Sequence, residues 1–126
     1  MPVYDLNAFM TCCIDAPSQI VLHKGVLEKA SNDFNLTTKE SLLGFIGNDG
    51  LENIRFINTK LWMEFAVKGI NIDVDAYEFD TRYRLGYIAF CYYRDKWNIK
   101  SFHLSSERNR AMEIALRNAG LIGIIL

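Results

Sequence analysis

Residues 83–104 read YRLGYIAFCYYRDKWNIKSFHL, and this stretch predicts a pair of β-strands. Aromatic and β-branched residues fill both of its halves, Tyr83 to Tyr93 and Trp97 to Leu104, as is typical of β-strands. Only Arg94-Asp95-Lys96 separates the two halves, so a tight hairpin is the natural connection. Two adjacent antiparallel strands are therefore predicted here.

A third strand is predicted upstream, where apolar residues recur at every second position. The apolar residues are Ile70, Ile72, Val74 and Ala76, and the intervening ones are Asn71, Asp73, Asp75 and Tyr77. This alternation predicts a strand with one face in water. Residues 70–104 are therefore expected to form an antiparallel meander.

Helices are expected before the meander. Residues 18–32 follow a turn at Pro17 and carry apolar residues at roughly helical spacing. Thr37-Thr38-Lys39-Glu40 match a capping box, which predicts a second helix that ends at the glycines of 47–50. Residues 1–14 and 51–68 are compatible with either helix or strand.

The C-terminal residues predict a last helix and a closing strand. Ser105 and Ser106 offer capping oxygens for a helix that ends at Gly120, and the apolar tail 121–126 follows. No repeat or linker divides the 126 residues, so 1–126 is expected to be a single domain. The predicted fold is α+β, with N-terminal helices packed on one antiparallel sheet, a C-terminal helix and a short closing strand.

Composition favours a cytoplasmic protein. No stretch approaches the ~20 apolar residues of a membrane-spanning helix, so no membrane partner is expected. The first residues lack the basic and apolar segments of a secretory signal. The three cysteines, Cys12, Cys13 and Cys91, are odd in number and two of them are adjacent, which suits a reducing compartment.

Common cofactor and metal motifs are absent from the sequence. Neither a phosphate-binding loop nor a dinucleotide-binding glycine pattern occurs, and no nucleophile elbow is found. The histidines and cysteines lack the spacing of metal ligands on one element. Asp73 and Asp75 would share one strand face, where paired carboxylates could hold magnesium, but a lysine is available only from another strand. We therefore expect no cofactor and no metal.

The charges segregate along the chain. Residues 1–81 carry six lysines and arginines against twelve acidic residues, whereas residues 82–126 carry eight against three. Either the two parts fold against each other and their charges cancel, or the basic part faces an anionic partner such as RNA.

The basic part could supply the groups for metal-free RNA cleavage, which requires a base, an acid and cations around the phosphate. The candidate catalytic residues are His103, Lys100 and Arg108, and the candidate substrate-binding residues are Arg84, Tyr87, Lys96 and Arg110. In a regular strand Lys100 and His103 lie on opposite faces, so both reach one site only if the strand ends or twists near Phe102. The alternative is a structural histidine at a strand end, with cations that coat a solvated surface.

Residues 83–110 resemble the strand, hairpin and following helix of small bacterial ribonuclease toxins of the RelE, BrnT and MqsR kind. In those proteins a short sheet packed on N-terminal helices carries basic and aromatic residues that cut messenger RNA without a metal. The resemblance implies a toxin-like endoribonuclease from a bacterium or phage, with RNA as substrate and a cognate protein inhibitor or target. It implies a catalytic or phosphate-binding role for Lys100, His103 and Arg108, with Tyr87 as a further candidate.

A second function remains open on the sequence alone. The acidic run 71–80 would suit a non-enzymatic interaction module, such as an antitoxin, an immunity protein or a phage-borne inhibitor, whose acidic face occludes a basic partner.

Overall fold

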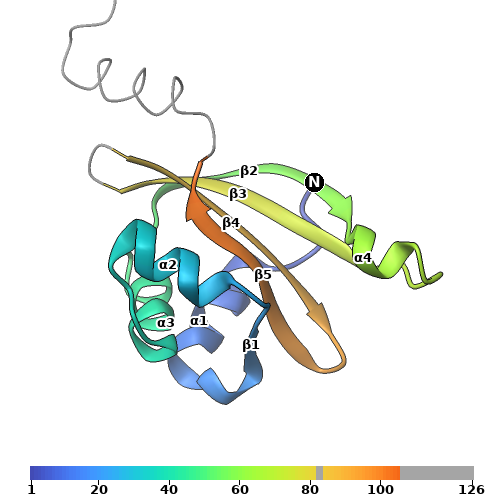
Figure 1. The fold of residues 1–126 in the computed structure, drawn as a ribbon, viewed down its shortest axis with the longest axis horizontal. Helices are drawn as coiled ribbons and strands as arrows, with labels where there is room; N and C mark the ends of the chain where they lie inside the picture. Colours follow the sequence, from blue (N-terminus) through green and yellow to red (C-terminus); the bar gives the residue numbers. More distant parts are fainter. Residues whose placement is uncertain (82–83, 106–126) are drawn as a thin grey trace, which may run out of the picture.

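A five-stranded mixed sheet forms the centre of the computed structural model, which describes residues 1–81 and 84–105 (Figure 1). Its strands are β1 (Ile20–Leu22), β2 (Glu52–Leu61), β3 (Asp73–Thr81), β4 (Arg84–Tyr93) and β5 (Lys96–Leu104). They lie in the order β1-β5-β4-β3-β2, with β1 parallel to β5 and every other pair antiparallel. The α+β class and the meander are confirmed, and the parallel strand β1 makes the sheet mixed instead of purely antiparallel.

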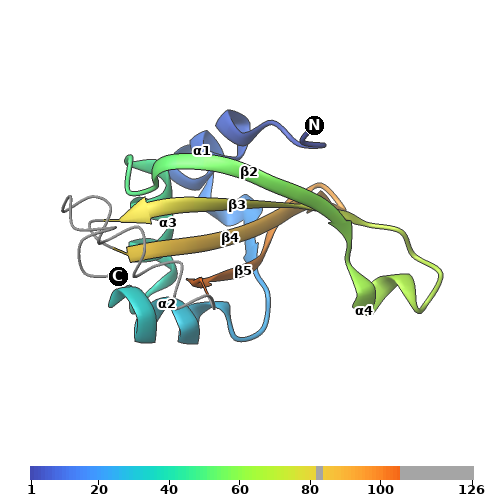
Figure 2. The same cartoon turned by 90° about the horizontal axis from the view of Figure 1, so that it is seen from above.

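The helices lie on the two faces of the sheet unequally. They are α1 (Leu6–Asp15), a 3-10 turn η1 (Pro17–Gln19), α2 (Val26–Phe34), α3 (Lys39–Gly47) and the short α4 (Met63–Ala66). Helices α1 to α3 cover one face, here called the helix face, whereas α4 stands at the opposite end of the molecule (Figures 1 and 2). Among the described residues, only the short α4 packs on the other face, here called the outer face.

Aromatic rings fill the core between the helix face and α1 to α3. The rings of Phe9 on α1 and Phe90 on β4 stack with centroids 4.0 Å apart, and those of Phe79 and Phe102 stack at 5.6 Å. All four side chains are fully buried. Burial of each such side chain contributes about 1.5–3 kcal/mol, which explains how the sheet and helices hold together without a disulfide among residues 1–81 and 84–105.

The hairpin between β4 and β5 closes as predicted. Arg94 and Asp95 both have positive φ angles, 54° and 61°, as the two central residues of a type I′ turn require. This turn matches the twist of the strands that it joins, and it sets the register in which Tyr93 pairs with Lys96.

Two predictions for the N-terminal half need correction. The helix predicted over 18–32 is wrong in its first part, because Ile20–Leu22 pairs with β5 and α2 begins only after Gly25, whose φ of 85° breaks the helical path. The capping box of α3 is built from Thr38 and Ser41, one position later than predicted, and the helix does end before the glycine-containing turn.

The solvated face predicted for β3 is also wrong. Asp75 is fully buried, because the backbone N–H groups of Val3 and Tyr4 and the Thr59 hydroxyl donate hydrogen bonds to its carboxylate. Tyr77 is buried against Phe90. The carboxylate of Asp75 is therefore occupied within the chain, and no group of three His, Cys, Asp or Glu side chains in the described ranges could hold a metal ion.

The predicted C-terminal helix and closing strand lie outside the described residues, as do Arg108 and Arg110. Among the helices that the structure describes, none has the length and apolar character needed to cross a membrane.

Candidate functional site

Strand β5 contains one extra residue, Lys100. Ala89 of β4 pairs with Ser101 and Phe90 pairs with Ile99, so Lys100 is bulged out of the ladder. Ile99 and the next buried residue, Phe102, both pack in the helix-face core. Lys100, Ser101 and His103 consequently all lie on the outer face. The shared face comes from a bulge at Lys100 and not from a strand end or twist near Phe102, which pairs regularly with Ile88.

Tyr87 and His103 are direct neighbours across β4 and β5. Their rings stack with centroids 5.1 Å apart and planes 15° apart. His103 Nδ1 lies 2.6 Å from the carbonyl oxygen of Leu104. Because a carbonyl oxygen only accepts, Nδ1 carries a proton and donates it. The lone pair of the neutral imidazole then lies on Nε2, which is the nitrogen that can accept a proton.

The Tyr87 hydroxyl is a hydrogen-bond donor on this face. Burial raises the pKa of the Tyr87 phenol above its ordinary value of 10.0, so the group stays protonated at neutral pH. The outer face thus places a neutral phenol directly beside an imidazole.

The row of Tyr87 and His103 continues across the sheet to two charged residues. Glu78 of β3 pairs with Tyr87, and Arg55 of β2 pairs with Glu78. Arg55 Nε lies 3.8 Å from Glu78 Oε1, and the Arg55 guanidinium also donates to Asp80. A carboxylate and an imidazole therefore flank Tyr87 on opposite sides.

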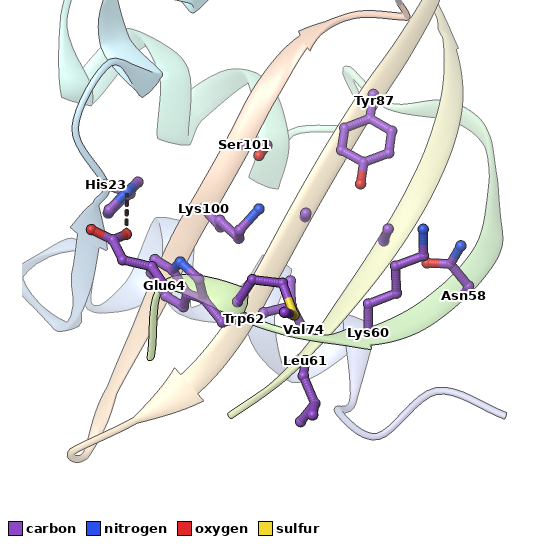
Figure 3. Close-up of a pocket in the computed structure, with 13 residues that line it drawn as sticks. His23, Asn58, Lys60, Leu61, Trp62, Glu64, Val74, Tyr87, Lys100 and Ser101 are labelled. Carbon is purple, nitrogen blue, oxygen red and sulfur yellow. Dashed lines mark ion pairs between the residues drawn. The ribbon is translucent and has the colours of Figure 1, made fainter. Parts of the chain in front are cut away.

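A hollow of about 500 Å³ lies beside Tyr87 on the outer face (Figure 3). Its floor contains Ala76, Ala89 and Ser101, which pair in register across β3, β4 and β5. These small side chains leave space that larger residues in a sheet would fill. Tyr87 forms one wall and Trp62, next to α4, forms the other.

Polar groups from three strands surround this hollow. In Figure 3 the Tyr87 hydroxyl and the Lys100 amine are directed toward it, and Lys60 and Asn58 lie side by side and line it from β2. At the rim His23 Nε2 lies 3.5 Å from Glu64 Oε2, and the His23 ring contacts Trp62 edge-on at 4.9 Å. The hollow can therefore accept an anion together with an apolar group.

A second, smaller hollow of about 290 Å³ adjoins the first at β5. Lys100 and Ser101 line both hollows, and the smaller one also contains His103, Lys24 and Lys29. Lysines thus line both hollows, with Glu64 in the first and Glu28 in the second, and a polyanion binds to such lysines through its phosphates.

Two of the predicted substrate-binding residues do not join this site. Arg84 lies toward the helix face, with its guanidinium carbon 5.8 Å from the centroid of the Phe34 ring. Lys96 lies at the hairpin end of β5, where its amine donates to the carbonyl oxygen of Ser18 at 3.4 Å. Of the seven predicted site residues, Tyr87, Lys100 and His103 are brought together, and Arg108 and Arg110 are not among the described residues.

Sequence reasoning missed the contributions of β2 and β3. Asn58, Lys60 and Arg55 lie in a segment that could not be assigned to helix or strand, and Glu78 was grouped with the acidic run. One signal could have found Glu78. It lies an even number of positions from Val74 and Ala76 and so shares their face of the strand, whereas Asp73 and Asp75 lie on the other face.

The two buried cysteines, Cys13 and Cys91, do not provide a nucleophile. Burial raises the pKa of the Cys13 thiol to about 12 and that of Cys91 to about 11. Both thiols are therefore protonated at neutral pH and serve as small core residues.

No family model, curated protein or solved structure matches this chain. Its function must therefore be inferred from the chemistry of the outer face.

Proposed function

We propose that this protein is a metal-independent endoribonuclease whose active site is the row of Glu78, Tyr87 and His103, with Lys100 as a phosphate-binding residue. The bulge at Lys100 is the observation that carries the proposal, because it puts the lysine on the same face as His103 and Tyr87. A proton-transfer group, a hydrogen-bond donor and a cation then act on one phosphate.

The proposed reaction is attack of a ribose 2′-oxygen on the adjacent phosphorus. Glu78 accepts the proton of the 2′-hydroxyl, the bond between phosphorus and the 5′-oxygen breaks, and protonated His103 donates the Nε2 proton to that oxygen. The products are a 2′,3′-cyclic phosphate and a 5′-hydroxyl. Neighbouring strands are about 4.8 Å apart, so Glu78 and His103 are separated by roughly 10 Å at their Cα atoms, with Tyr87 between them.

Other groups would bind the charge that develops on the phosphate. The Lys100 ammonium and the Tyr87 hydroxyl act directly on it, and Arg55 orients the Glu78 carboxylate. Arg108 and Arg110 follow β5 in the chain, and we keep the sequence-based proposal that they contribute further phosphate contacts. An intracellular RNA substrate agrees with a cytoplasmic protein, which the three free cysteines also favour.

Incubation of the purified protein with mixed-sequence RNA in the presence of EDTA tests this proposal. We expect RNA products that end in a 2′,3′-cyclic phosphate and no cleavage of DNA of the same sequence, because DNA lacks the attacking hydroxyl. His103→Ala and Glu78→Gln should each lower the rate by roughly 10²–10⁴-fold.

Lys100→Ala should weaken RNA binding and reduce the slope of log affinity against log salt by about 0.7, the value for one lost phosphate contact on a single strand. Lys39→Ala is the matched control, because it removes the same charge from the exposed start of α3. Absence of cleavage at high protein concentration, or equal cleavage by wild type and His103→Ala, would overturn the proposal.

The acidic run 71–80 does not favour the alternative of an acidic interaction module. Asp75 is buried under the N-terminal segment, while Glu78 and Asp80 pair with Arg55.

Growth of a bacterial host separates the two functions. Induced expression should arrest growth if the protein cuts RNA, and normal growth with abundant soluble protein would favour an interaction module.

A further inference from the structure

We propose that the hollow beside Tyr87 binds the base and phosphate of a single nucleotide, and that it forms the nucleotide-binding subsite of the proposed cleavage site. The inference rests on the proposed function, because the hollow shares Tyr87 and Lys100 with that site. It adds the chemical class of the ligand, a nucleoside monophosphate unit.

The floor of the hollow suits a flat apolar group. Ala76 and Ala89 are 3% and 1% exposed, and Val74 and Trp62 extend this apolar surface toward α4. Small side chains in register on three adjacent strands create a recess with a flat base. The volume of about 500 Å³ lies within the usual range for small-molecule sites, ~300–1,000 Å³.

The rim of the hollow suits a phosphate. Lys60 lines the hollow from β2 and Lys100 lines it from β5, so two lysines lie on opposite sides of it (Figure 3). The hydroxyls of Tyr87 and Ser101 add neutral donors between them. Two cations with hydroxyl donors disfavour a purely apolar ligand, and an apolar floor disfavours a bare anion; a nucleotide satisfies both requirements.

Asn58 provides a group that can recognise a base. Asn58 pairs with Ala76 in the same row as the floor residues, so its amide lies at the β2 end of the recess. The amide has both donor and acceptor atoms, and it can form paired hydrogen bonds with a base edge.

The neighbouring hollow extends the same surface. Because Lys100 and Ser101 line both spaces, a nucleotide in the first hollow would continue over β5 toward His103, Lys24 and Lys29. The sugar–phosphate chain would then pass the Tyr87 and His103 pair, where cleavage is proposed.

Isothermal titration calorimetry of the intact chain tests the subsite. The probes are adenosine 3′-monophosphate and uridine 3′-monophosphate, with adenosine, uridine and inorganic phosphate as separate controls. We expect both nucleotides to bind at least tenfold more tightly than any of the three controls. Lys60→Ala should weaken nucleotide binding by roughly 10–100-fold, the effect of losing a charge-assisted hydrogen bond.

Further variants separate the subsite from general electrostatics and from misfolding. Lys39→Ala removes an equal charge away from the hollow and should leave nucleotide binding unchanged. Ser101→Leu places a larger side chain on the floor and should abolish binding, and a thermal melt tests whether this variant folds. Lys60→Ala gives the result independently if Ser101→Leu fails to fold.

The experiments distinguish an error in the nucleotide subsite from an error in the proposed nuclease activity. If wild type cuts RNA but Lys60→Ala binds the nucleotides as tightly as wild type does, the subsite is wrong and the nuclease stands. If the nucleotides bind with the predicted dependence on Lys60 but no RNA is cut, the nuclease is wrong and the nucleotide site stands. Inorganic phosphate that binds as tightly as the nucleotides would show an anion site and overturn the inference.

Discussion

Asp75→Ala is expected to cause a large loss of stability and to release the N-terminal segment. Asp75 is fully buried, and its Oδ2 accepts hydrogen bonds from the backbone N–H groups of Val3 and Tyr4, each at 2.8 Å. Its Oδ1 accepts a third bond from the Thr59 hydroxyl. One carboxylate therefore joins β2, β3 and the residues that precede α1.

The size of the effect follows from these three bonds. A hydrogen bond to a charged group contributes about 1.5–3 kcal/mol, but bonds that share one acceptor are not additive. We expect Asp75→Ala to lower the free energy of unfolding by about 4–6 kcal/mol, which is a large part of the ~5–15 kcal/mol of a typical domain. Asp75→Asn should cost less, about 1–3 kcal/mol, because the amide oxygen can still accept from the Val3 and Tyr4 N–H groups while the amide NH2 donates to the Thr59 hydroxyl oxygen.

Urea unfolding measures these differences, and amide hydrogen exchange locates them. The Val3 and Tyr4 amides should exchange faster in both Asp75 variants, because their acceptor is lost or weakened. Thr59→Ala removes only one bond and should cost about 1–2 kcal/mol, so it remains informative if Asp75→Ala does not fold. Asp73→Ala, at an exposed position of the same strand, should change stability by no more than about 0.5 kcal/mol. A cost below 1 kcal/mol for Asp75→Ala would refute the reasoning.

Three further predictions concern Gly86, Asp95 and Cys91 in the sheet. Gly86→Ala should cost about 1–3 kcal/mol in urea unfolding, because a Cβ there would lie 2.2 Å from Cζ of Phe79; Phe79→Leu should recover part of that cost in a double-mutant cycle. Asp95→Gly should raise stability by about 0.5 kcal/mol, since φ is 61°, and a lower melting temperature would contradict this. Burial raises the pKa of Cys91 from 9.0 to about 11, so the folded state keeps a proton that the unfolded state releases. Stability should therefore fall as pH rises from about 9 to about 11, and Cys91→Ala should make this slope shallower.

The C-terminal half of the sheet could be predicted because its signals are local. The aromatic and β-branched residues of 84–93 and 96–104 flank a two-residue turn, so propensity and connection length agree. Strand β1 could not be predicted in the same way. Its residues Ile20–Leu22 fit a helical pattern, and only their pairing with distant Trp97 to Ile99 makes them a strand.

Strand β2 escaped prediction for a different reason. Its pairing with β3 shifts register between Glu52 and Arg55 and again between Phe56 and Asn58, so no simple alternation runs through its ten residues. The buried state of Asp75 was likewise invisible, because it depends on the N-terminal segment folding over β3. A charged residue at alternate positions of a strand indicates a solvent-exposed face only where no other part of the chain supplies hydrogen-bond donors to it.

The candidate site was predicted where its residues lie on the hairpin and missed where they lie on β2 and β3. Tyr87, Lys100 and His103 come from β4 and β5, which were assigned correctly. Lys100 shares the face of Tyr87 and His103 only through the bulge, and neither glycine nor proline marks the position of the bulge in the sequence. Lys60 and Glu78 enter the site only through the order of strands in the sheet.

Because Lys100 is the extra residue of the bulge, evolution can add or remove it without changing the core. Without this residue, Ile99, Ser101, Phe102 and His103 would alternate perfectly and keep the faces that they have now. A single codon inserted into the gene for an unbulged ancestor would add the lysine while moving no buried side chain, and loss of that codon would reverse the step. A homologue without this residue would keep the same sheet, so a gap opposite Lys100 in an alignment would mark a difference in chemistry and not in fold.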